Sequence, residues 1–533
     1  MRKRSAWRGS VPAGPALALA LSAAPAGGGA PEVGAPEVGA LEVGALDVGL
    51  LDVGPPRFED LSDRLPEHVY SGGWEHFVGG GVAAFDCGGN GVPDLFVAGG
   101  AGPALLLRNL GGMRFDPAPL PDLTGVTGAY PLDIDGDGVL DLFVLRVGPN
   151  TVLRGLGDCA FEDATDALGI DPGDAWSTAF TAWWEPGAER PSMLVGNYVD
   201  RDDPDGPFFA CDDNQLLRPT GDGWRSEPLA PGFCTLSALA ARDARDRLTL
   251  RLSNDRHYFV RGGFEQMWDI AEGRFLGAQD GWPELSLWGM GIASRDITGN
   301  GLNDVYLTSM ADQVLQLAEE DGTYRLAPFE MGHTAHRPHS GDDGRPSTGW
   351  HAQWGDVLNN GRADLFVAKG NVDQMPDLAM HDPDSLLLQR SDGRFIEAAA
   401  AAGVGDPARG RGAALVDLDG DGRLDLVVVN RRAPLRLYRN VSEDVGRWLG
   451  VALRAPGGNT QAVGARVEVQ TEDALQWQEV AVGGGHAGGQ AVPLHFGLGA
   501  ADVALIRVLW PDGAETIEAH GALDRVVQIE RRD

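Results

Sequence analysis

The sequence has little positive charge. It contains 43 Lys and Arg residues against 77 Asp and Glu residues, which gives a formal net charge of −34 over 533 residues. Nucleic acids and anionic membrane surfaces attract proteins through Lys and Arg, so we expect neither as a partner. Outside a short stretch near the N-terminus, no apolar run approaches the ~20 residues of a membrane-spanning helix. We therefore expect no membrane span.

Common catalytic motifs are also missing. The sequence has no His-Glu-x-x-His, Cys-x-x-Cys or Gly-x-Ser-x-Gly pattern. One stretch places His333, His336 and His339 before Asp342 and Asp343, a set that could bind a transition metal. The prolines and glycines around it favour a solvated insertion loop instead. The sequence leaves the question of enzymatic activity open and leans against it.

The N-terminal part has the layout of an exported protein. Met1–Arg8 is basic, Val11–Ala24 is small and apolar, and Ala24-Pro25-Ala26 offers a cleavage site. This predicts a secretory signal over residues 1–26, with a disordered basic N-terminus as the alternative. No lipobox cysteine follows, so we expect a secreted or periplasmic product. Residues 27–56 repeat the pattern PEVGA and predict a flexible acidic linker, or alternatively an interaction segment.

Cysteine is scarce, with four residues in the whole chain. In an exported protein this number predicts two disulfides, and the pairing with the smallest loop joins Cys211 to Cys234. Cys87 and Cys159 then pair by default and would connect neighbouring repeats. Free buried thiols are the alternative.

Aspartate and glycine are abundant, and they recur in one loop pattern. The clearest copy, DIDGDGVLD, runs from Asp133 to Asp141 and leads into the apolar run LFVL. Carboxylates at positions 1, 3, 5 and 9, a glycine for the turn at position 6 and a main-chain carbonyl at position 7 form an oxygen-rich set that suits Ca²⁺. An EF-hand would need Glu at position 12, where Val144 stands, and helices on both sides. The expected ligands are Asp133, Asp135, Asp137, Val139 through its carbonyl, and Asp141.

Recurrence of the loop argues against a metal-free surface turn, which is the alternative for a single copy. One further copy keeps all four aspartates, and three weaker copies keep positions 1 and 9. Fewer carboxylates predict weaker binding in those three. The second strong copy adds Asp417, Asp419, Asp421, Arg423 through its carbonyl, and Asp425; the weaker copies add Asp86, Asn90, Asp94, Asp296, Asn300, Asp304, Asp356, Asn360 and Asp364. Two more segments, 179–197 and 238–254, align with the repeat but have other residues at the ligand positions, so we expect them to be metal-free.

The repeats number seven, at intervals of roughly 45 to 60 residues, which is typical of a propeller or solenoid. Each consists of a Gly-rich apolar strand, the loop, a β-branched strand and a hairpin with an aromatic strand, which are the four strands of a propeller blade. We expect an all-β fold, with a seven-bladed β-propeller over residues 57–440 and a small β-rich domain over 441–533. The seventh repeat lacks its fourth strand. Arg57–Leu61 resembles the fourth strand of the second repeat and could complete the last blade, or it is a plain lead-in strand.

The repeats resemble FG-GAP or VCBS repeats of integrin α-chain propellers and exported microbial proteins. Three C-terminal segments resemble the ASPIC/UnbV domain of the cartilage acidic protein family: NTQAVGARV (459–467), HFGLG (495–499) and VLWPDG (508–513). The resemblance implies a secreted calcium-binding propeller with a small C-terminal β module, and it implies no particular reaction. Residues 485–490 depart from the family's usual aromatic and Ser-Gln at this turn.

Three functions are compatible with these observations. The favoured one is a calcium-stabilised extracellular interaction or adhesion module, monomeric, with structural Ca²⁺ and a protein or glycan partner. The second is a propeller enzyme acting on polysaccharide, a lyase or hydrolase; Trp74, Trp288, Trp350 and Trp354 could stack on sugars, although packing within the ring explains them equally well. The third is an accessory protein of a natural-product pathway, which rests on association alone.

Overall fold

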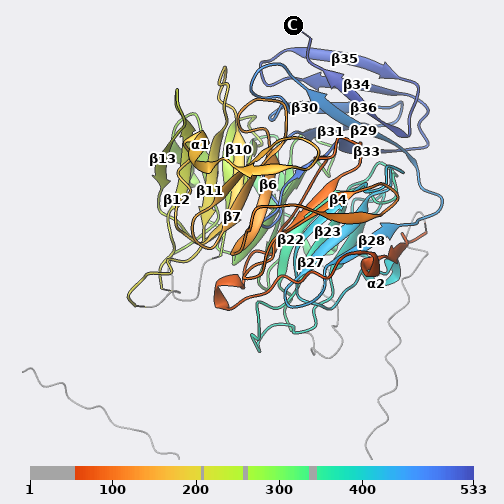
Figure 1. Ribbon diagram of the computed structural model, residues 1–533. Coiled ribbons are helices and arrows are strands. Elements are labelled where there is room, and N and C mark those ends of the chain that lie inside the picture. Colours follow the sequence, from red (N-terminus) through yellow and green to blue (C-terminus); the bar gives the residue numbers. More distant parts are fainter. Residues whose placement is uncertain (1–53, 206–208, 256–261, 335–344, 533) are drawn as a thin grey trace, which may run out of the picture. The chain divides into compact units, whose positions relative to one another are not determined.

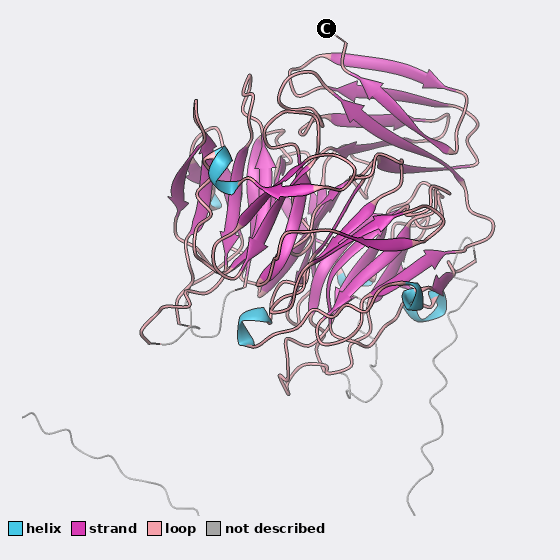
Figure 2. Cartoon of the chain, viewed as in Figure 1, coloured by secondary structure: helices cyan, strands magenta, loops and turns pink. Residues whose placement is uncertain are grey.

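The computed structural model describes residues 54–205, 209–255, 262–334 and 345–532. The predicted signal peptide, nearly all of the predicted linker, and His336 and His339 lie outside the described residues. The described residues all belong to one compact unit, Leu46–Asp533. Strands dominate it (Figure 2), and its helices are single turns: α1 (Thr165–Leu168), α2 (Ala399–Ala402), η2 (Ser62–Arg64), η3 (Trp74–His76), η4 (Ala278–Asp280) and η5 (Phe329–Met331).

Each sequence repeat folds into an antiparallel sheet whose strands pair in chain order. The first two strands of each sheet lie nearest the centre of the molecule and are the most buried. The short outer strands carry the exposed residues. The first three sheets are β2–β5 (Val82–Phe85, Asp94–Val97, Leu105–Asn109, Phe115–Ala118), β6–β9 (Val126–Leu132, Asp141–Arg146, Thr151–Gly155, Phe161–Asp163) and β10–β13 (Ser177–Trp183, Ser192–Asn197, Asn214–Pro219, Trp224–Leu229).

Four more sheets of the same kind follow. They are β14–β17 (Thr235–Arg242, Leu248–Asn254, Gln266–Asp269, Arg274–Phe275), β18–β21 (Gly289–Arg295, Asp304–Ser309, Val314–Ala318, Tyr324–Leu326), β22–β25 (Gly349–Gly355, Asp364–Lys369, Ser385–Gln389, Phe395–Glu397) and β26–β28 (Gly410–Val416, Asp425–Asn430, Arg436–Asn440) with β1 (Phe58–Asp60). The described residues thus contain one sheet for each of the seven predicted repeats.

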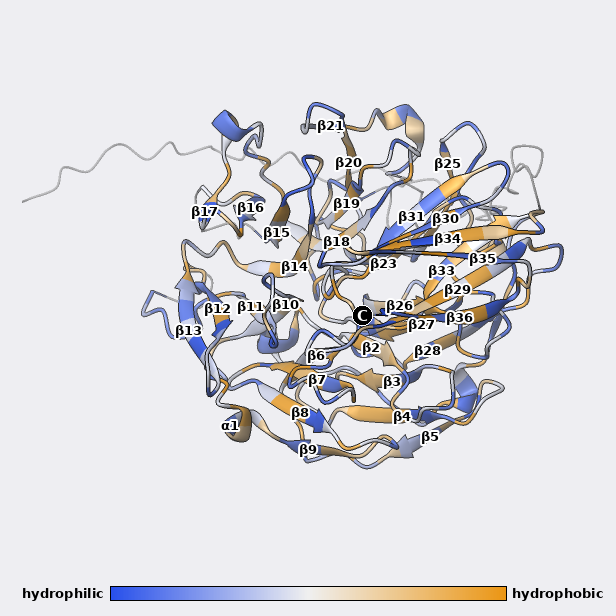
Figure 3. Cartoon of the chain, turned by 90° about the horizontal axis from the view of Figure 1, so that it is seen from above, coloured by the Kyte–Doolittle hydropathy of each residue, from blue (hydrophilic) through white to orange (hydrophobic). Residues whose placement is uncertain are grey.

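The first strands of the sheets form a closed ring. Strands β2, β6, β10, β14, β18, β22 and β26 each contact the next in this order, and β26 contacts β2. Figure 3 shows the sheets radiating from a common centre. This is the arrangement of a β-propeller, and the all-β prediction is confirmed.

The N-terminal segment closes the ring, as the sequence comparison of Arg57–Leu61 with the second repeat suggested. Strand β1 pairs with β28 in antiparallel register, with Phe58 opposite Asn440 and Asp60 opposite Tyr438. The last sheet therefore combines strands from both ends of the propeller. This pairing covers two strand edges that would otherwise be free to pair with another chain.

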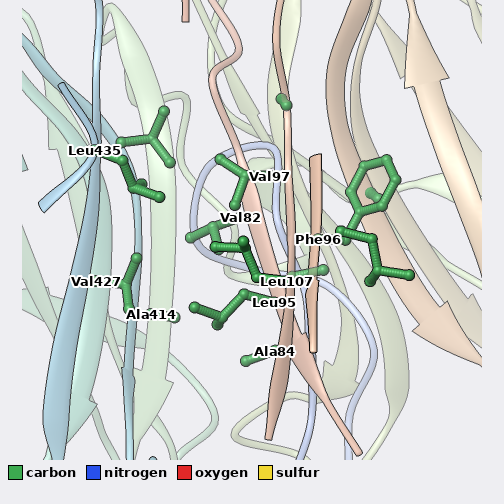
Figure 4. Close-up of a cluster of buried hydrophobic side chains, with 14 of the residues drawn as sticks. Val82, Ala84, Leu95, Phe96, Val97, Leu107, Ala414, Val427 and Leu435 are labelled. Atoms are coloured by element: carbon green, nitrogen blue, oxygen red, sulfur yellow. The ribbon is translucent and has the colours of Figure 1, made fainter. Parts of the chain in front are cut away.

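Apolar residues at alternate strand positions fill the spaces between sheets. In one cluster, Val82, Leu95 and Leu107 of the first sheet pack with Ala414 and Val427 of the last sheet (Figure 4). All five are almost completely buried. Since burial of one Val or Leu side chain contributes about 1.5 to 3 kcal/mol, such clusters contribute strongly to holding neighbouring sheets together.

The C-terminal residues form two further sheets, blue in Figure 1. Their strands alternate buried and exposed residues and enclose a core of their own around Phe496, Ile506 and Trp510. The first sheet has the order β33 (Leu494–Gly499), β29 (Arg447–Arg454), β36 (Arg525–Glu530), and the second β31 (Leu475–Glu479), β30 (Arg466–Gln470), β34 (Ala504–Leu509), β35 (Glu515–His520).

A glycine-rich segment of this C-terminal part, residues 482–491, enters the ring. It forms bridges with the first strands β10, β14, β18 and β6, and its last residues, β32 (Gln490–Ala491), add a parallel strand to β2. A Cβ atom on Gly488 would lie 2.3 Å from the carbonyl oxygen of Val82, so only glycine fits there. The C-terminal part and the propeller are therefore interlocked.

His486 anchors this segment and is completely buried. Its Nε2 accepts a hydrogen bond from Gly79 N (3.1 Å), and its Nδ1 lies 3.0 Å from the carbonyl oxygen of Met290. These partners fix the neutral tautomer with the proton on Nδ1. Burial lowers the pKa of His486 to about 3, so the ring stays neutral. The turn at residues 485–490 thus has a structural place inside the propeller.

Candidate metal sites

The aspartate loops connect the first and second strands of their sheets, and each loop is held by its own carboxylates. In the loop between β6 and β7, Asp133 accepts hydrogen bonds from Gly136 N (2.8 Å) and Gly138 N (2.9 Å). Asp141, at the start of β7, accepts from Ile134 N and Gly155 N (both 2.9 Å). The backbone thus fixes the first and the last predicted ligand before any ion is considered.

The loop between β26 and β27 repeats this pattern. Asp417 accepts hydrogen bonds from Gly420 N and Gly422 N (both 2.8 Å). Asp425 accepts from Leu418 N (2.9 Å) and Asn440 N (2.8 Å). Two loops 284 positions apart in sequence (417 minus 133) have the same geometry because they have the same spacing of Asp and Gly.

The donor set fits one calcium ion per loop. In each loop, carboxylate oxygens of three aspartates all lie within 4.8 Å of one another: Asp133, Asp135 and Asp141 in one, and Asp417, Asp419 and Asp425 in the other. Oxygen ligands on opposite sides of a Ca²⁺ ion are about 5 Å apart, since each Ca–O distance is about 2.4 Å. Hard carboxylate oxygens are also the ligands that this ion prefers.

The position-5 aspartates lie outside these groups of three. Asp137 accepts a hydrogen bond from Val139 N (2.8 Å), and Asp421 accepts from Arg423 N (3.0 Å). Each therefore stabilises the turn with one oxygen. Their role as ligands, and that of the Val139 and Arg423 carbonyls, stays a prediction.

Burial makes the charged form of these carboxylates costly. Desolvation, with a smaller contribution from neighbouring aspartates, raises the pKa of Asp141 to about 7 and that of Asp417 to about 6. It also raises the pKa of Asp133 and, strongly, that of Asp425. A divalent cation would offset both the desolvation and the repulsion.

An arginine from the third strand approaches each strong loop, a feature that the sequence analysis missed. Arg154 of β8 forms an ion pair with Asp135, and Arg439 of β28 forms one with Asp419 (2.7 Å). Both arginines occupy the same strand position, in TVLRG and RLYRN. This recurrence was a visible signal. The guanidinium groups neutralise part of the loop charge and compete with a metal ion for one oxygen.

The three weaker loops keep the backbone pattern without the cluster. Asp86, Asp296 and Asp356 each accept two loop N–H groups, as Asp133 does. Position 3 holds Gly88, Thr298 and Leu358, and among the described residues no third carboxylate completes these loops. Asn90 and Asn300 donate their side-chain N–H to main-chain carbonyls of the third strand. Metal binding in these loops stays a prediction.

The connections in the two remaining sheets use different chemistry. Between β14 and β15, Asp243 accepts hydrogen bonds from Arg245 N and Arg247 N and forms an ion pair with Arg247 (2.6 Å). Between β10 and β11, the loop contains Trp184, Glu185 and Pro186. Where the strong repeats have clustered carboxylates, the β14–β15 connection has an arginine and the β10–β11 connection has an aromatic residue.

Four of the five aspartate loops contact the C-terminal part directly, which no local pattern predicted. Thr460 Oγ1 donates to Asp133 Oδ2 (2.5 Å), and Asp133 N donates to Gln461 Oε1 (2.9 Å). Trp477 Nε1 donates to Asp296 Oδ2 (3.0 Å). The other contacts are Gly446 N to Leu358 O (2.9 Å), Gly499 N to Asn359 O (2.8 Å), and His495 Nε2 with Gly422 O (3.0 Å). The predicted metal face of the propeller therefore lies against the C-terminal part.

Both predicted disulfides are confirmed. Cys211 pairs with Cys234, and Cys87 pairs with Cys159. The second bridge joins the weak loop of the first sheet to the hairpin of the second sheet, and Asp94 accepts a hydrogen bond from Cys87 N (2.8 Å). Since both sulfurs are in the disulfide, this loop offers no thiolate for a metal.

The predicted alternatives for tryptophan and histidine are resolved only in part. Trp350 and Trp354 are buried within the ring, and the guanidinium of Arg411 lies 4.0 Å from the Trp350 ring centre. Trp74 and Trp288 are half-buried and pack against the same apolar cluster as Trp350. Packing accounts for Trp350 and Trp354, whereas Trp74 and Trp288 keep part of their surface exposed. His333 is buried, but the rest of the histidine stretch is not described.

Comparisons with known families agree with this architecture. A family model described as an FG-GAP-like repeat matches residues 86–144 and 371–428, which include the loop of Asp133–Asp141 and the loop of Asp417–Asp425 up to Val428. A second model, ASPIC and UnbV, matches residues 455–533. The chain contains FG-GAP-like repeats and an ASPIC and UnbV domain. The domain supplies both Thr460 and the segment that enters the ring.

Relatives match only part of the chain. It is 30% identical to cartilage acidic protein 1 of Homo sapiens over 163 residues, which cover 29% of this chain and 22% of that protein. The same protein of Mus musculus is 29% identical over 163 residues, with 29% and 23% covered. The chain thus spans about a fifth of the length of these curated relatives. Among solved structures, YCF48 bound to D1 peptide is 10% identical, with 74% of this chain and 97% of that chain covered and a TM-score of 0.42.

Within the described residues, no helix is both long and apolar enough to cross a membrane.

Proposed function

We propose that this protein is a calcium-stabilised interaction module that works outside the cytoplasm. The observation that carries the proposal is the pair of loops in which three carboxylate oxygens lie within 4.8 Å of one another. Asp133, Asp135 and Asp141 would hold one ion. Asp417, Asp419 and Asp425 would hold the other. Position-5 aspartates and position-7 carbonyls would complete each shell, and the three weaker loops would bind less tightly.

Calcium in these loops would act on more than the loops themselves. Asp133 is both a predicted ligand and the acceptor of the Thr460 hydroxyl, and Asp296 accepts from Trp477. An ion that fixes these carboxylates would also fix the surface on which the ASPIC and UnbV domain lies. We infer a structural role for calcium, in which it joins the propeller loops and the C-terminal domain into one rigid body.

An extracellular place for this module is supported by its disulfides. Structural disulfides persist in oxidising compartments, and this chain has two among its described residues. Extracellular calcium modules typically bind with dissociation constants of about 10⁻⁴ to 10⁻³ M, so the sites would be filled wherever calcium is in the millimolar range. The partner is an extracellular protein or glycan.

Calcium titration tests this proposal. The purified full chain is titrated by calorimetry, its bound metal is measured after dialysis, and its thermal melt is recorded with calcium and with a chelator. We expect at least two ions per chain and a higher melting temperature in calcium. Absence of bound calcium together with identical melts would reduce the aspartate loops to turns and remove the proposal.

A further inference from the structure

A groove lies between the C-terminal domain and the β10–β11 and β14–β15 connections, the two that have no aspartate loop. It has a volume of about 910 Å³. It is lined by residues 182–189 at the end of β10 and in the β10–β11 connection, residues 242, 247 and 248 around the β14–β15 connection, residues 269–272, and residues 455–459 and 510–512 of the C-terminal domain. This volume is at the upper end of the range for ligand sites, about 300 to 1,000 Å³. Four of the five aspartate loops contact the C-terminal domain directly, whereas here a space remains between the two parts beside their hydrogen bonds.

The groove offers apolar contact surface. Trp184 lines it, together with Pro186, Pro456 and Pro511, and Trp510 forms its floor from the core of the C-terminal domain. Trp184 is half-buried, and the three prolines are exposed. Indole and proline surfaces bind the aliphatic stems of long side chains, and an indole face also attracts a cation.

Negative charge exceeds positive charge along the groove. Its lining contains six carboxylates and three guanidinium groups: Glu185, Glu189, Asp269, Glu272, Glu479 and Asp512 against Arg242, Arg247 and Arg531. All three arginines already have acidic partners, because Arg247 pairs with Asp269, Arg531 with Asp512 and Arg242 with Asp246. The three guanidinium groups of the groove are therefore already paired with carboxylates of this chain.

Two of the carboxylates have no ion pair among the described residues. Glu189 accepts a hydrogen bond from Gly458 N (3.1 Å), and Glu479 accepts one from Arg242 N (3.3 Å). Burial raises the pKa of Glu479 to about 7, and the hydrogen bond from Arg242 N and the charges of Arg242 and Arg466 offset this rise only in part. A positively charged ligand group would relieve this cost.

We propose that this groove binds a basic peptide segment of a partner protein, with Lys or Arg side chains on Glu189 and Glu479 and their stems against Trp184. The inference rests on the proposed function as an interaction module and names the chemistry of its partner. A net charge of −34 adds long-range attraction for a basic partner, while the groove supplies the specific contacts.

Binding of a labelled peptide that alternates Arg and Gly, with three arginines, tests the inference. Fluorescence anisotropy is measured with the full chain in saturating calcium. The groove variant combines Glu189→Gln, Glu272→Gln and Glu479→Gln, which keep the shape and the hydrogen-bond acceptors. The control combines Glu59→Gln, Glu162→Gln and Glu320→Gln. These three residues are exposed and lie outside the groove, and their substitution removes the same amount of charge.

We expect the groove variant to weaken binding at least tenfold and the control variant to change it less than threefold. Equal losses in both variants, or no loss in either, would overturn the proposal. Spermidine carries three charges as well; if it displaces the peptide with equal affinity, the groove recognises charge alone and the assignment to a peptide fails. Calcium binding measured on the same samples reports separately on the proposed function, so each idea can fail without the other.

Discussion

The propeller contains two kinds of repeat, which differ in how they stabilise buried carboxyl groups. Five repeats have an aspartate loop between their first two strands, and two of these loops gather three carboxylates each. The repeats of β10–β13 and β14–β17 have no such loop. The latter buries Asp243 in its first connection, where Arg247 pairs with it, and buries Glu265 beside its third strand. The comparison shows that a buried carboxyl group is stabilised either by a counter-ion or by protonation, and that different repeats use different ones.

Glu265 shows the proton solution. Its Oε1 accepts a hydrogen bond from Asn254 N (2.9 Å), and burial raises its pKa to about 8, an effect that Arg251 offsets only in part. Desolvation also raises the pKa of the first and last aspartates of the strong loops, yet these aspartates gather around a space that suits a divalent ion. They are Asp133, Asp141, Asp417 and Asp425. The position of the acids relative to each other, rather than their burial, separates the two cases.

The largest expected effect concerns Glu265. Its folded pKa, about 8, lies above its unfolded value of 4.5, so protonation favours the folded state and the free energy of unfolding falls as pH rises from about 4.5 to about 8. The replacement Glu265→Gln removes this fall, on the order of 3 to 5 kcal/mol. In saturating calcium, the melting temperature of Glu265→Gln should be close to that of the wild type at pH 5 and higher than that of the wild type at pH 8. Exposed Glu320→Gln is the control, and parallel pH profiles for wild type and Glu265→Gln would contradict the prediction.

The next effect comes from the strong loops. The double variant Asp135→Ala and Asp419→Ala should bind two fewer calcium ions and lose about 2 to 4 kcal/mol of unfolding free energy in ~5 mM calcium, from about 1 to 2 kcal/mol per site. Its melt in chelator should change much less. Metal analysis measures the number of bound ions, and melts with calcium and with chelator measure the change in stability. The matched control is Asp116→Ala with Asp122→Ala, two exposed aspartates outside the loops; an unchanged ion count in the double variant would remove these ligands from the proposal.

A smaller effect is expected where the strong loop meets the C-terminal domain. Thr460→Val removes the hydroxyl that donates to Asp133 and should lower the unfolding free energy by about 1.5 kcal/mol, because the acceptor is a charged carboxylate. Thr220→Val removes an exposed Thr–Asp hydrogen bond in the repeat of β10–β13 and should change it by less than about 0.5 kcal/mol. Urea unfolding compares the two. Equal losses would mean that the loop contact has no special strength.

The smallest effect tests the arginine beside the loop. Arg154→Gln removes the guanidinium that pairs with Asp135 and should raise calcium affinity about threefold, since a partly exposed charge interaction contributes less than about 1 kcal/mol. Arg114→Gln, an exposed residue away from the strong loops, is the control. Calorimetry in low salt resolves the difference. Weaker binding by Arg154→Gln would show that the arginine orders the loop instead of competing with the ion.

The repeats, their strands and both disulfides followed from the sequence. A period of two in the strands, a fixed distance between Asp and Gly in the loops, and the short distance from Cys211 to Cys234 are local signals. The closing strand at Phe58 was also predictable, because it repeats the motif of another strand. In each case a motif or spacing visible in the chain carried the prediction.

The candidate site was predictable only in part. The spacing of Asp133, Asp135 and Asp141 indicated their gathering, and the recurring arginine of the third strand was visible but not recognised. Thr460 and Trp477 had no signal, since a single Thr or Trp in a β-rich domain is unremarkable until the domain is placed. The groove at Trp184 likewise exists only because two parts of the fold face each other.

By itself, then, the sequence determined the seven repeats, the geometry of each aspartate loop and the pairing of the cysteines. The tertiary structure decided that the C-terminal domain lies on the loops, that its glycine-rich segment enters the ring, and that a groove remains beside the two repeats without aspartate loops. The physical reason is distance along the chain. Asp133 and Thr460 are 327 residues apart, and Gly79 and His486 are 407 apart. Contacts over such separations leave no periodicity in a sequence, and only the packed structure brings their partners together.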